Sequence, residues 1–160
     1  MMKKYQGGIE WVSIKMDPGS SNFRGGTKMT DNFYVVTNNP LFFESEFRTF
    51  RTFRTEVVNG SFEDVLLKVR DMIHQGHELI SHPLGASIRM MYSPYRSVLV
   101  GEKTDKMNSF YVEVIEGSIE TYRKNTGHRN IDLKNEKDYA LIDQHLLMEA
   151  VKEHENLKKA

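Results

Sequence analysis

The sequence contains no cysteine, which excludes disulfide bonds, thiolate metal sites and a cysteine nucleophile. Lysine plus arginine and aspartate plus glutamate both number 22, so the formal net charge is zero and no global field favours nucleic acid. No apolar run reaches the roughly 20 residues that a membrane-spanning helix needs. Lys3 and Lys4 are not followed by the apolar region of a signal peptide. We therefore expect a cytoplasmic protein that does not contact a membrane.

The chain of 160 residues is long enough for one domain with a substantial core. Glycine, proline and serine interrupt residues 1–30, which predicts a partly flexible N-terminal extension. Residues 31–158 alternate short β-type runs with helical stripes, which predicts a single α/β domain. We expect three layers, with a mainly parallel sheet of about four strands and three helices.

Short apolar or β-branched runs predict strands at 33–37, 53–58, 77–81 and from 95 or 96 to 100. Helical periodicity predicts helices at 61–76, 105–125 and 138–158. Ser61 is a suitable N-cap for the first helix and Thr104 for the second. The core face expected for the third helix is Tyr139, Ile142, Leu146, Ala150 and Val151. A helix joins the second and third strands through short links, so we expect those strands to form a parallel pair.

The residues of most interest lie in two loops that follow predicted strands, because ligands of parallel sheets bind beyond the carboxyl ends of the strands. If the first and third strands are neighbours, both loops line one crevice. Main-chain N–H groups of residues 85–87 would then be offered to an anion. The expected ligand-binding residues are Asn38, Asn39, His82, Pro83, Gly85, Ser87, Arg89, Tyr95 and Arg96.

His82 is the candidate catalytic residue, as a general acid or base with Ser81 or Ser87 as its partner. The alternative is a turn histidine bonded to the backbone, just as Asn38 and Asn39 can serve turn chemistry alone. His74, His77 and His82 have no carboxylate cluster beside them, so we expect no metal site. The phosphate-binding patterns GxxxxGK[ST] and GxGxxG are absent, and we expect no cofactor. The three remaining histidines are expected in solvent: His128, His145 and His154.

Residues 47–55 repeat Phe-Arg-Thr three times. Arginine contacts phosphate and aromatic rings stack on bases, so one hypothesis is nucleic-acid binding. The other is a connecting segment with its phenylalanines on the core, and the neutral net charge favours it. Residues 90–95 are too apolar for an ordinary exposed loop, so they either fold back as a lid or contact another protein.

Four motifs, in this order along the chain, resemble the GrdX family: TNNP at 37–40, VNGS at 58–61, GHELISHPL at 76–84 and SPYRSVL at 93–99. That family is encoded with the glycine, sarcosine and betaine reductase genes of amino-acid-fermenting anaerobes. The resemblance covers roughly residues 33–150, and residues 1–30 are additional to it. It implies an accessory, reductase-linked role and brings no known catalytic residue.

These observations favour an accessory protein of glycine-reductase-type amino-acid metabolism. Its expected partner is a small anionic ligand or a reductase component, bound at the His82 loop. A small enzyme that uses His82, and nucleic-acid binding through the Phe-Arg-Thr triplets, are the alternatives. A homo-oligomer is compatible with each of them.

Overall fold

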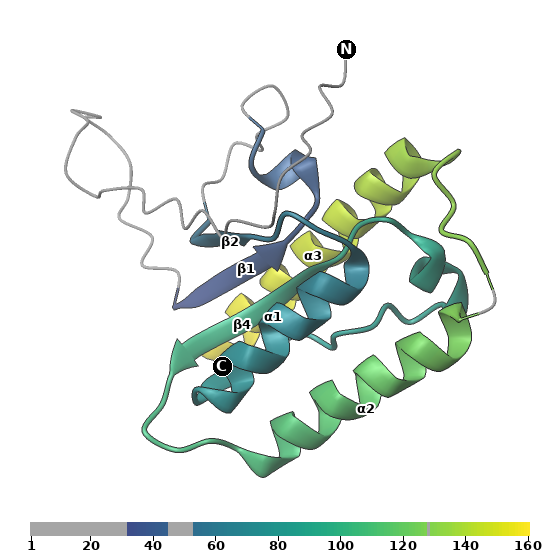
Figure 1. Cartoon of the computed structure of the whole chain (residues 1–160). Coiled ribbons are helices and arrows are strands. Elements are labelled where there is room, and N and C mark those ends of the chain that lie inside the picture. The colour runs from purple at the N-terminus through teal and green to yellow at the C-terminus, as the bar shows by residue number, and fades with distance from the viewer. Residues whose placement is uncertain (1–31, 45–52, 128) are drawn as a thin grey trace, which may run out of the picture.

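The computed structural model describes residues 32–44, 53–127 and 129–160 (Figure 1). The N-terminal extension and the first two Phe-Arg-Thr triplets lie outside these ranges. The strands are β1 (Phe33–Thr37), β2 (Thr55–Val57), β3 (His77–Leu79) and β4 (Ser97–Lys103). The helices are α1 (Phe62–His74), α2 (Ser109–Thr126) and α3 (Glu136–Lys159), with short 3-10 segments η1 (Pro40–Phe42) and η2 (Ile88–Tyr92). None of the helices in the described ranges combines the length and apolar character that a bilayer crossing requires.

The four strands form a mixed sheet in the order β2-β1-β4-β3. β1 and β2 are parallel, whereas β4 is antiparallel to both of its neighbours. The expectation of a mainly parallel sheet is therefore wrong. The physical reason is the link between β3 and β4, which contains no crossover helix and reverses the chain direction, so β4 enters the sheet against the other three strands.

The expectation that β2 and β3 form a pair is also wrong. α1 does join two strands that run in the same direction, but β1 and β4 lie between them. A helical crossover requires a common direction and not adjacency. One consequence matters for the site. The last residues of β1, β2 and β3 lie at the same edge of the sheet as Ser97, the first residue of β4, which pairs with Thr37.

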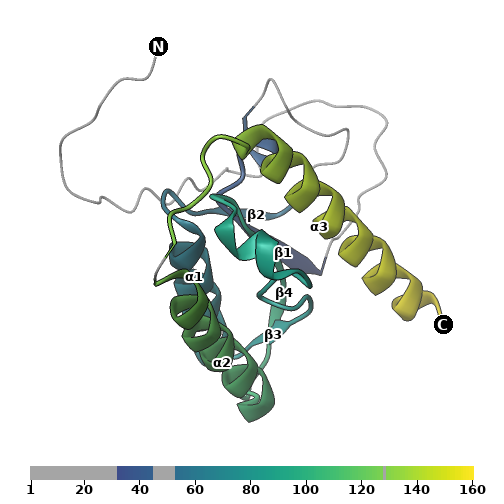
Figure 2. The same ribbon diagram turned by 90° about the vertical axis from the view of Figure 1, so that its right-hand side faces the viewer.

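The fold has three layers, with the sheet between α1 and α2 on one face and α3 on the other (Figure 2). Successive strand residues point to opposite faces. Accordingly Val36 and Val98 join the α1 and α2 core, whereas Val35 and Leu99 join the core beneath α3. The sheet is thus buried on both sides, and its exposed chemistry is confined to its edges and end loops.

α1 begins and ends as its sequence indicates. The Ser61 hydroxyl accepts the Asp64 N–H at 3.2 Å, and the Asp64 carboxylate accepts the Ser61 N–H at 2.7 Å, which is a complete capping box. The helix stops before Gly76, whose φ of 101° favours glycine. A Cβ atom at Gly76 would lie 2.7 Å from the Thr104 carbonyl oxygen, so no other residue fits there without a shift.

α2 begins later than expected, because Asn108 and not Thr104 is its N-cap. The Asn108 side chain accepts the Phe110 N–H at 2.9 Å. The Thr104 hydroxyl is instead bonded to the carbonyl oxygens of Gly76 and Lys106. The Thr104 hydroxyl therefore joins the end of α1 to the chain before α2.

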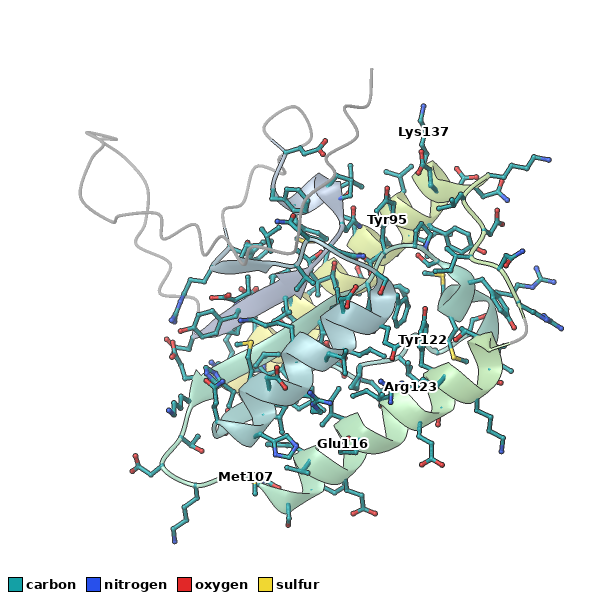
Figure 3. All side chains as sticks on the ribbon, viewed as in Figure 1. Tyr95, Met107, Glu116, Tyr122, Arg123 and Lys137 are labelled. Carbon is teal, nitrogen blue, oxygen red and sulfur yellow. The ribbon has the colours of Figure 1, made fainter. Side chains whose placement is uncertain are left out.

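Contacts of three kinds hold α2 against α1 (Figure 3). Phe62 of α1 stacks on Tyr122 of α2 with ring centroids 4.6 Å apart. Arg123 forms an ion pair with Glu63 at 2.6 Å. The His74 Nε2 atom and the Glu116 carboxylate form a further polar contact at 3.0 Å. The two helices are therefore one packed unit, with the aromatic contact and the ion pair at the start of α1 and the His74 contact at its end.

Candidate functional site

A buried polar network lies where β1 ends and β4 begins, and the α3 residue Asp143 is its centre. Asp143 is 1% exposed. Its carboxylate accepts the Ser97 N–H at 2.9 Å, the Ser97 hydroxyl at 2.6 Å and the Asn39 side-chain N–H at 2.8 Å. Because the Ser97 proton goes to Asp143, the Thr37 hydroxyl must donate to Ser97 across their 2.6 Å contact. Thr37 in turn accepts the Asn39 N–H, so the bonds form one directed chain that ends on a carboxylate.

Arg96 connects this network to the loop after β3. Its side chain donates to the carbonyl oxygens of Pro83 at 2.7 Å and His82 at 2.8 Å, and it lies 3.9 Å from the Asp143 carboxylate. Burial lowers the pKa of Arg96, and the negative charge of Asp143 opposes that shift. The guanidinium therefore holds the start of the loop through backbone atoms and is enclosed by protein.

The amides of Asn38 and Asn39 are likewise used inside the protein. Asn38 donates to the carbonyl oxygens of Gly60 and Pro94 at 2.9 and 2.8 Å and accepts the Arg96 N–H at 2.8 Å. Asn39 also accepts the Leu41 N–H at 3.1 Å and donates to a carbonyl oxygen of α3. Both side chains are buried, so their bonds join separate segments of chain at this edge of the sheet.

His82 lies in an exposed turn. Its Nδ1 atom lies 3.1 Å from both the main-chain nitrogen and the carbonyl oxygen of Leu84. In the described part of the chain no side chain bonds to either ring nitrogen, so nothing orients His82 as a base. The contact is that of a turn histidine bonded to backbone. Nor do three histidine, aspartate or glutamate side chains in the described ranges gather closely enough to hold a metal ion.

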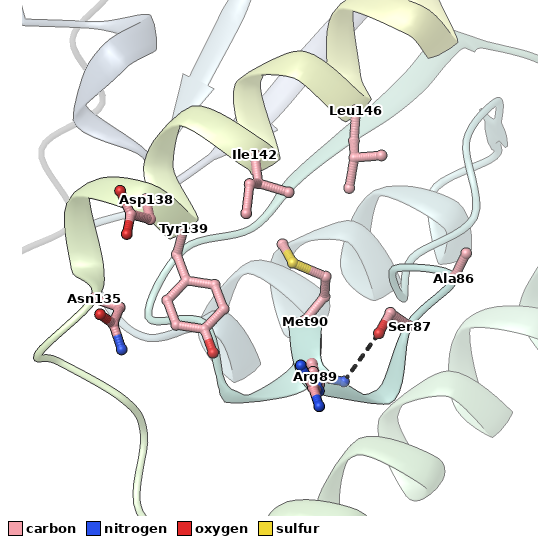
Figure 4. A pocket seen from close by; sticks show the side chains of 9 residues that line it. All are labelled: Ala86, Ser87, Arg89, Met90, Asn135, Asp138, Tyr139, Ile142 and Leu146. Atoms are coloured by element: carbon pink, nitrogen blue, oxygen red, sulfur yellow. Dashed lines mark hydrogen bonds between the residues drawn. The ribbon is translucent and has the colours of Figure 1, made fainter.

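A mostly apolar groove of about 500 Å³ lies between the η2 segment and the first half of α3 (Figure 4). Its volume falls within the range of small-molecule sites, roughly 300–1,000 Å³. One wall comes from the segment after the His82 turn and the other from α3. The residues that line it are Ala86, Ser87, Arg89, Met90, Asn135, Asp138, Tyr139, Ile142 and Leu146.

The η2 wall has a defined shape because a helix cap and two buried methionines hold it against the domain. The Ser87 hydroxyl accepts the Arg89 N–H at 3.3 Å and caps η2. Met90 and Met91 are buried, and Met91 belongs to the core, so these two methionines fold back onto the domain. A Cβ atom at Gly85 would lie 2.9 Å from the Met90 side chain, so glycine allows the loop to pass closely over Met90.

The α3 wall consists of apolar side chains that the sheet does not use. The residues of α3 that the domain buries are Ala140, Asp143, Leu147 and Val151. Ile142 and Leu146 are 45% and 38% exposed, and in Figure 4 both point from α3 toward the side of Met90. The core face expected for this helix was therefore wrong at these two positions. α3 carries two apolar stripes, and the sheet takes the one that contains Asp143.

The comparison that decides the family covers this whole region. The matched residues are 34–152, and they include both walls of the groove. The chain belongs to the GrdX-like protein family. No curated protein and no solved structure matches it.

In this GrdX-like chain the expected site residues separate into three groups. Ser87 and Arg89 line the groove. Asn38, Asn39, Pro83 and Arg96 make the internal bonds described above. His82, Gly85 and Tyr95 lie on the same loop but not in the groove lining. Burial, with the charges of Glu136 and Glu44, raises the pKa of the Tyr95 phenol.

Sequence reasoning missed Asp143 and assigned Ile142 and Leu146 to the core. A signal for Asp143 was present in its spacing. It lies three residues after Ala140 and four before Leu147, on a helical face that is otherwise apolar. A carboxylate on such a face requires buried donors, because an unpaired buried charge is costly.

The third Phe-Arg-Thr triplet is the one that the structure describes. Phe53 is buried and lies 6.0 Å from the Phe33 ring, measured between centroids. Arg54 forms an ion pair with Glu102 and lies over the Tyr34 ring. For this triplet the contacts are those of a connecting segment. The other two triplets lie outside the described residues.

His154, expected in solvent, is half-buried at the C-terminal half of α3. Its ring meets Phe33 edge to face with centroids 5.8 Å apart, and its buried Nε2 atom has no hydrogen-bond partner among the described residues. Burial lowers the pKa of His154. The charge of Lys158 acts in the same direction, while Glu78 and Glu155 oppose it. His128 lies outside the described residues.

A pH dependence follows from His154. Its pKa is about 6.5 in an unfolded chain and lower in the folded one. As the pH falls below about 6.5, the unfolded state binds this proton first, so the free energy of unfolding decreases. Urea titrations at pH 7.5 and 5.5 should show that His154→Phe reduces this loss. His145→Phe, an exposed control on the same helix, should leave the loss unchanged. Equal losses in the wild type and His154→Phe would contradict the assignment.

Proposed function

We propose that this GrdX-like protein is an accessory binding protein of glycine-reductase-type amino-acid metabolism, and that the groove between η2 and α3 is its binding site. The metabolic context rests on the family, whose name and motifs suggest a link with glycine reductase. The binding role rests on one observation, the apolar groove with Ser87 and Arg89 at its η2 wall. The η2 wall of the groove is formed by the segment 86–90, which follows the His82 turn in the chain.

The support for a binding role comes from how rigidly the two walls are held. Arg96 fixes the beginning of the loop through the carbonyl oxygens of His82 and Pro83. Asp143 fixes α3 to the start of β4 through Ser97. Both anchors belong to the same buried network. A site whose walls are already ordered loses less entropy when a ligand binds.

A binding role is favoured over catalysis by the chemistry around the groove. His82 is directed into its own turn and lacks an orienting partner among the described side chains. The Ser87 hydroxyl accepts a backbone N–H and has no described base beside it. Ser87 therefore lacks the hydrogen-bonded base that activates a nucleophile, and His82 lacks the partner that would orient it as a base.

The proposal is tested by gene replacement in a host that carries a glycine, sarcosine or betaine reductase. Ile142→Asp places a charge in the groove and should impair growth that depends on the reductase as fully as deletion of the gene does. Leu141→Asp is the matched control, because Leu141 is the neighbouring exposed residue of α3 and does not line the groove. Circular dichroism should show both variants folded. Normal growth with Ile142→Asp would reject the groove as the functional site, and normal growth after deletion would reject the metabolic role.

A further inference from the structure

We propose that the groove binds an amphipathic anion, with its negative group on Arg89 and its apolar body against Met90, Ile142 and Leu146. The inference rests on the proposed function in that it takes the groove as the binding site. It adds the chemical class of the ligand. A carboxylate or sulfonate on a medium-length aliphatic chain or a fused ring system has this character.

Arg89 is the first reason. It is exposed at the groove, and in the described part of the chain no side chain forms an ion pair or hydrogen bond with its guanidinium. The other described arginines all have partners: Arg54 with Glu102, Arg70 with Asp71, Arg96 with Asp143, Arg123 with Glu63 and Arg129 over Tyr92. Arg89 is thus a planar set of donors without an acceptor, which suits a bidentate anion.

The apolar wall is the second reason. Ile142 and Leu146 are one helical turn apart and partly exposed, and Figure 4 shows them on the same side of α3 as Tyr139. Met90 rises toward them from the η2 wall. Methionine adapts its shape to the group it packs against. An apolar body placed here would cover side-chain surface that the domain itself leaves open.

The charge pattern is the third reason. Among the described residues that line the groove, Asp138 alone carries a carboxylate, and Figure 4 shows it directed away from Arg89. The Tyr139 ring extends into the groove with its hydroxyl on the Arg89 side. The charge that faces an occupant is therefore positive, with a hydroxyl beside it. This arrangement favours an anionic head over a cationic or a neutral one.

The test uses two fluorescent probes that differ in charge, titrated against the full chain. 8-Anilinonaphthalene-1-sulfonate carries an anionic head, and N-phenyl-1-naphthylamine has the same rings without it. We expect one site for the sulfonate, at least about tenfold tighter than for the neutral probe, since one charge-assisted contact is lost. Decanoate should displace the sulfonate, and 1-decanol should displace it much less.

Variants separate the two halves of the proposed site. Arg89→Gln should lower the affinity for the sulfonate about tenfold and leave the affinity for the neutral probe unchanged. Arg89→Lys should retain part of the affinity for the sulfonate. Ile142→Gln should lower the affinity for both probes. Leu141→Gln should change neither affinity, because Leu141 is exposed on the same turn of α3 but outside the groove.

Each contrary outcome is distinct from failure of the proposed function. Equal affinity for both probes, lost in Ile142→Gln, would overturn the anionic head and keep the groove. No binding of either probe, with growth still lost in Ile142→Asp, would overturn the small ligand in favour of a protein partner. A changed molecular mass of Ile142→Gln by light scattering would identify a second copy as the occupant. Trp11 is the one tryptophan of the chain. If its emission, measured without any probe, differs between the wild type and Ile142→Gln, the N-terminal segment would be identified as the occupant.

Discussion

Asp143→Ala is expected to lower the free energy of unfolding by about 3–5 kcal/mol, because it removes one partner of a buried ion pair. The Arg96 guanidinium would remain enclosed with its positive charge uncompensated. Donors of Ser97 and Asn39 would also lose their acceptor inside the protein. Each buried donor left unpaired adds a desolvation cost of about 1–3 kcal/mol, although such costs are not additive.

Urea unfolding followed by far-UV circular dichroism measures this effect. Glu149→Ala is the matched control, because Glu149 is an exposed acidic residue of the same helix and its loss should change stability by no more than about 0.5 kcal/mol. Asp143→Asn should fall between the two, since it keeps one oxygen acceptor and removes the charge. A loss below about 1 kcal/mol in Asp143→Ala would show that water or a rearranged partner replaces the carboxylate.

Phe62→Ala is expected to cost about 3–5 kcal/mol of unfolding free energy, as is usual for a phenylalanine truncated in a packed core. Phe62 is fully buried and stacks on Tyr122 with an angle of 15° between the rings. Burial, with the charges of Glu63 and Asp64, raises the pKa of Tyr122 to about 12. Truncation would remove the stacking partner and leave a cavity where the start of α1 packs against the last turns of α2.

The matched control is Phe110→Ala, since Phe110 is a phenylalanine of α2 that is 64% exposed. Its loss should change stability by no more than about 0.5 kcal/mol. Both midpoints can be read from the same urea titration. Similar losses in the two variants would mean that α1 and α2 do not depend on this stacked pair.

Local chemistry made some elements predictable. The Phe33–Thr37 strand is a short β-branched and aromatic run, and it is β1 as expected. Ser61 and Asp64 specify the start of α1, and Gly76 lies just past its end. The direction of β4 was not predictable in this way. A run of valine and leucine is equally suited to either direction, and the irregular link before it contains no pattern that sets one.

The site was predictable only in part, because short motifs do not distinguish internal bonds from exposed ones. Asn38, Asn39 and Arg96 are polar residues beside strand ends, as ligand-binding residues often are, but their bonds run to the protein itself. α3 presented a different ambiguity. Ile142 and Leu147 both fit an apolar stripe, and only the packed structure decides which stripe the sheet covers.

The way in which Arg96 holds the loop has a consequence for how this protein can change. Its bonds go to the main-chain oxygens of His82 and Pro83 and so do not depend on which side chains the loop carries. Residues 86–89 lie between the part of the loop that Arg96 holds and the buried Met90, and they are exposed. Apart from Ser87, whose hydroxyl caps η2, their identities are thus largely uncoupled from folding. The exposed residues of the loop can therefore be substituted, in homologues or by design, and so change the binding specificity while the rest of the fold is retained.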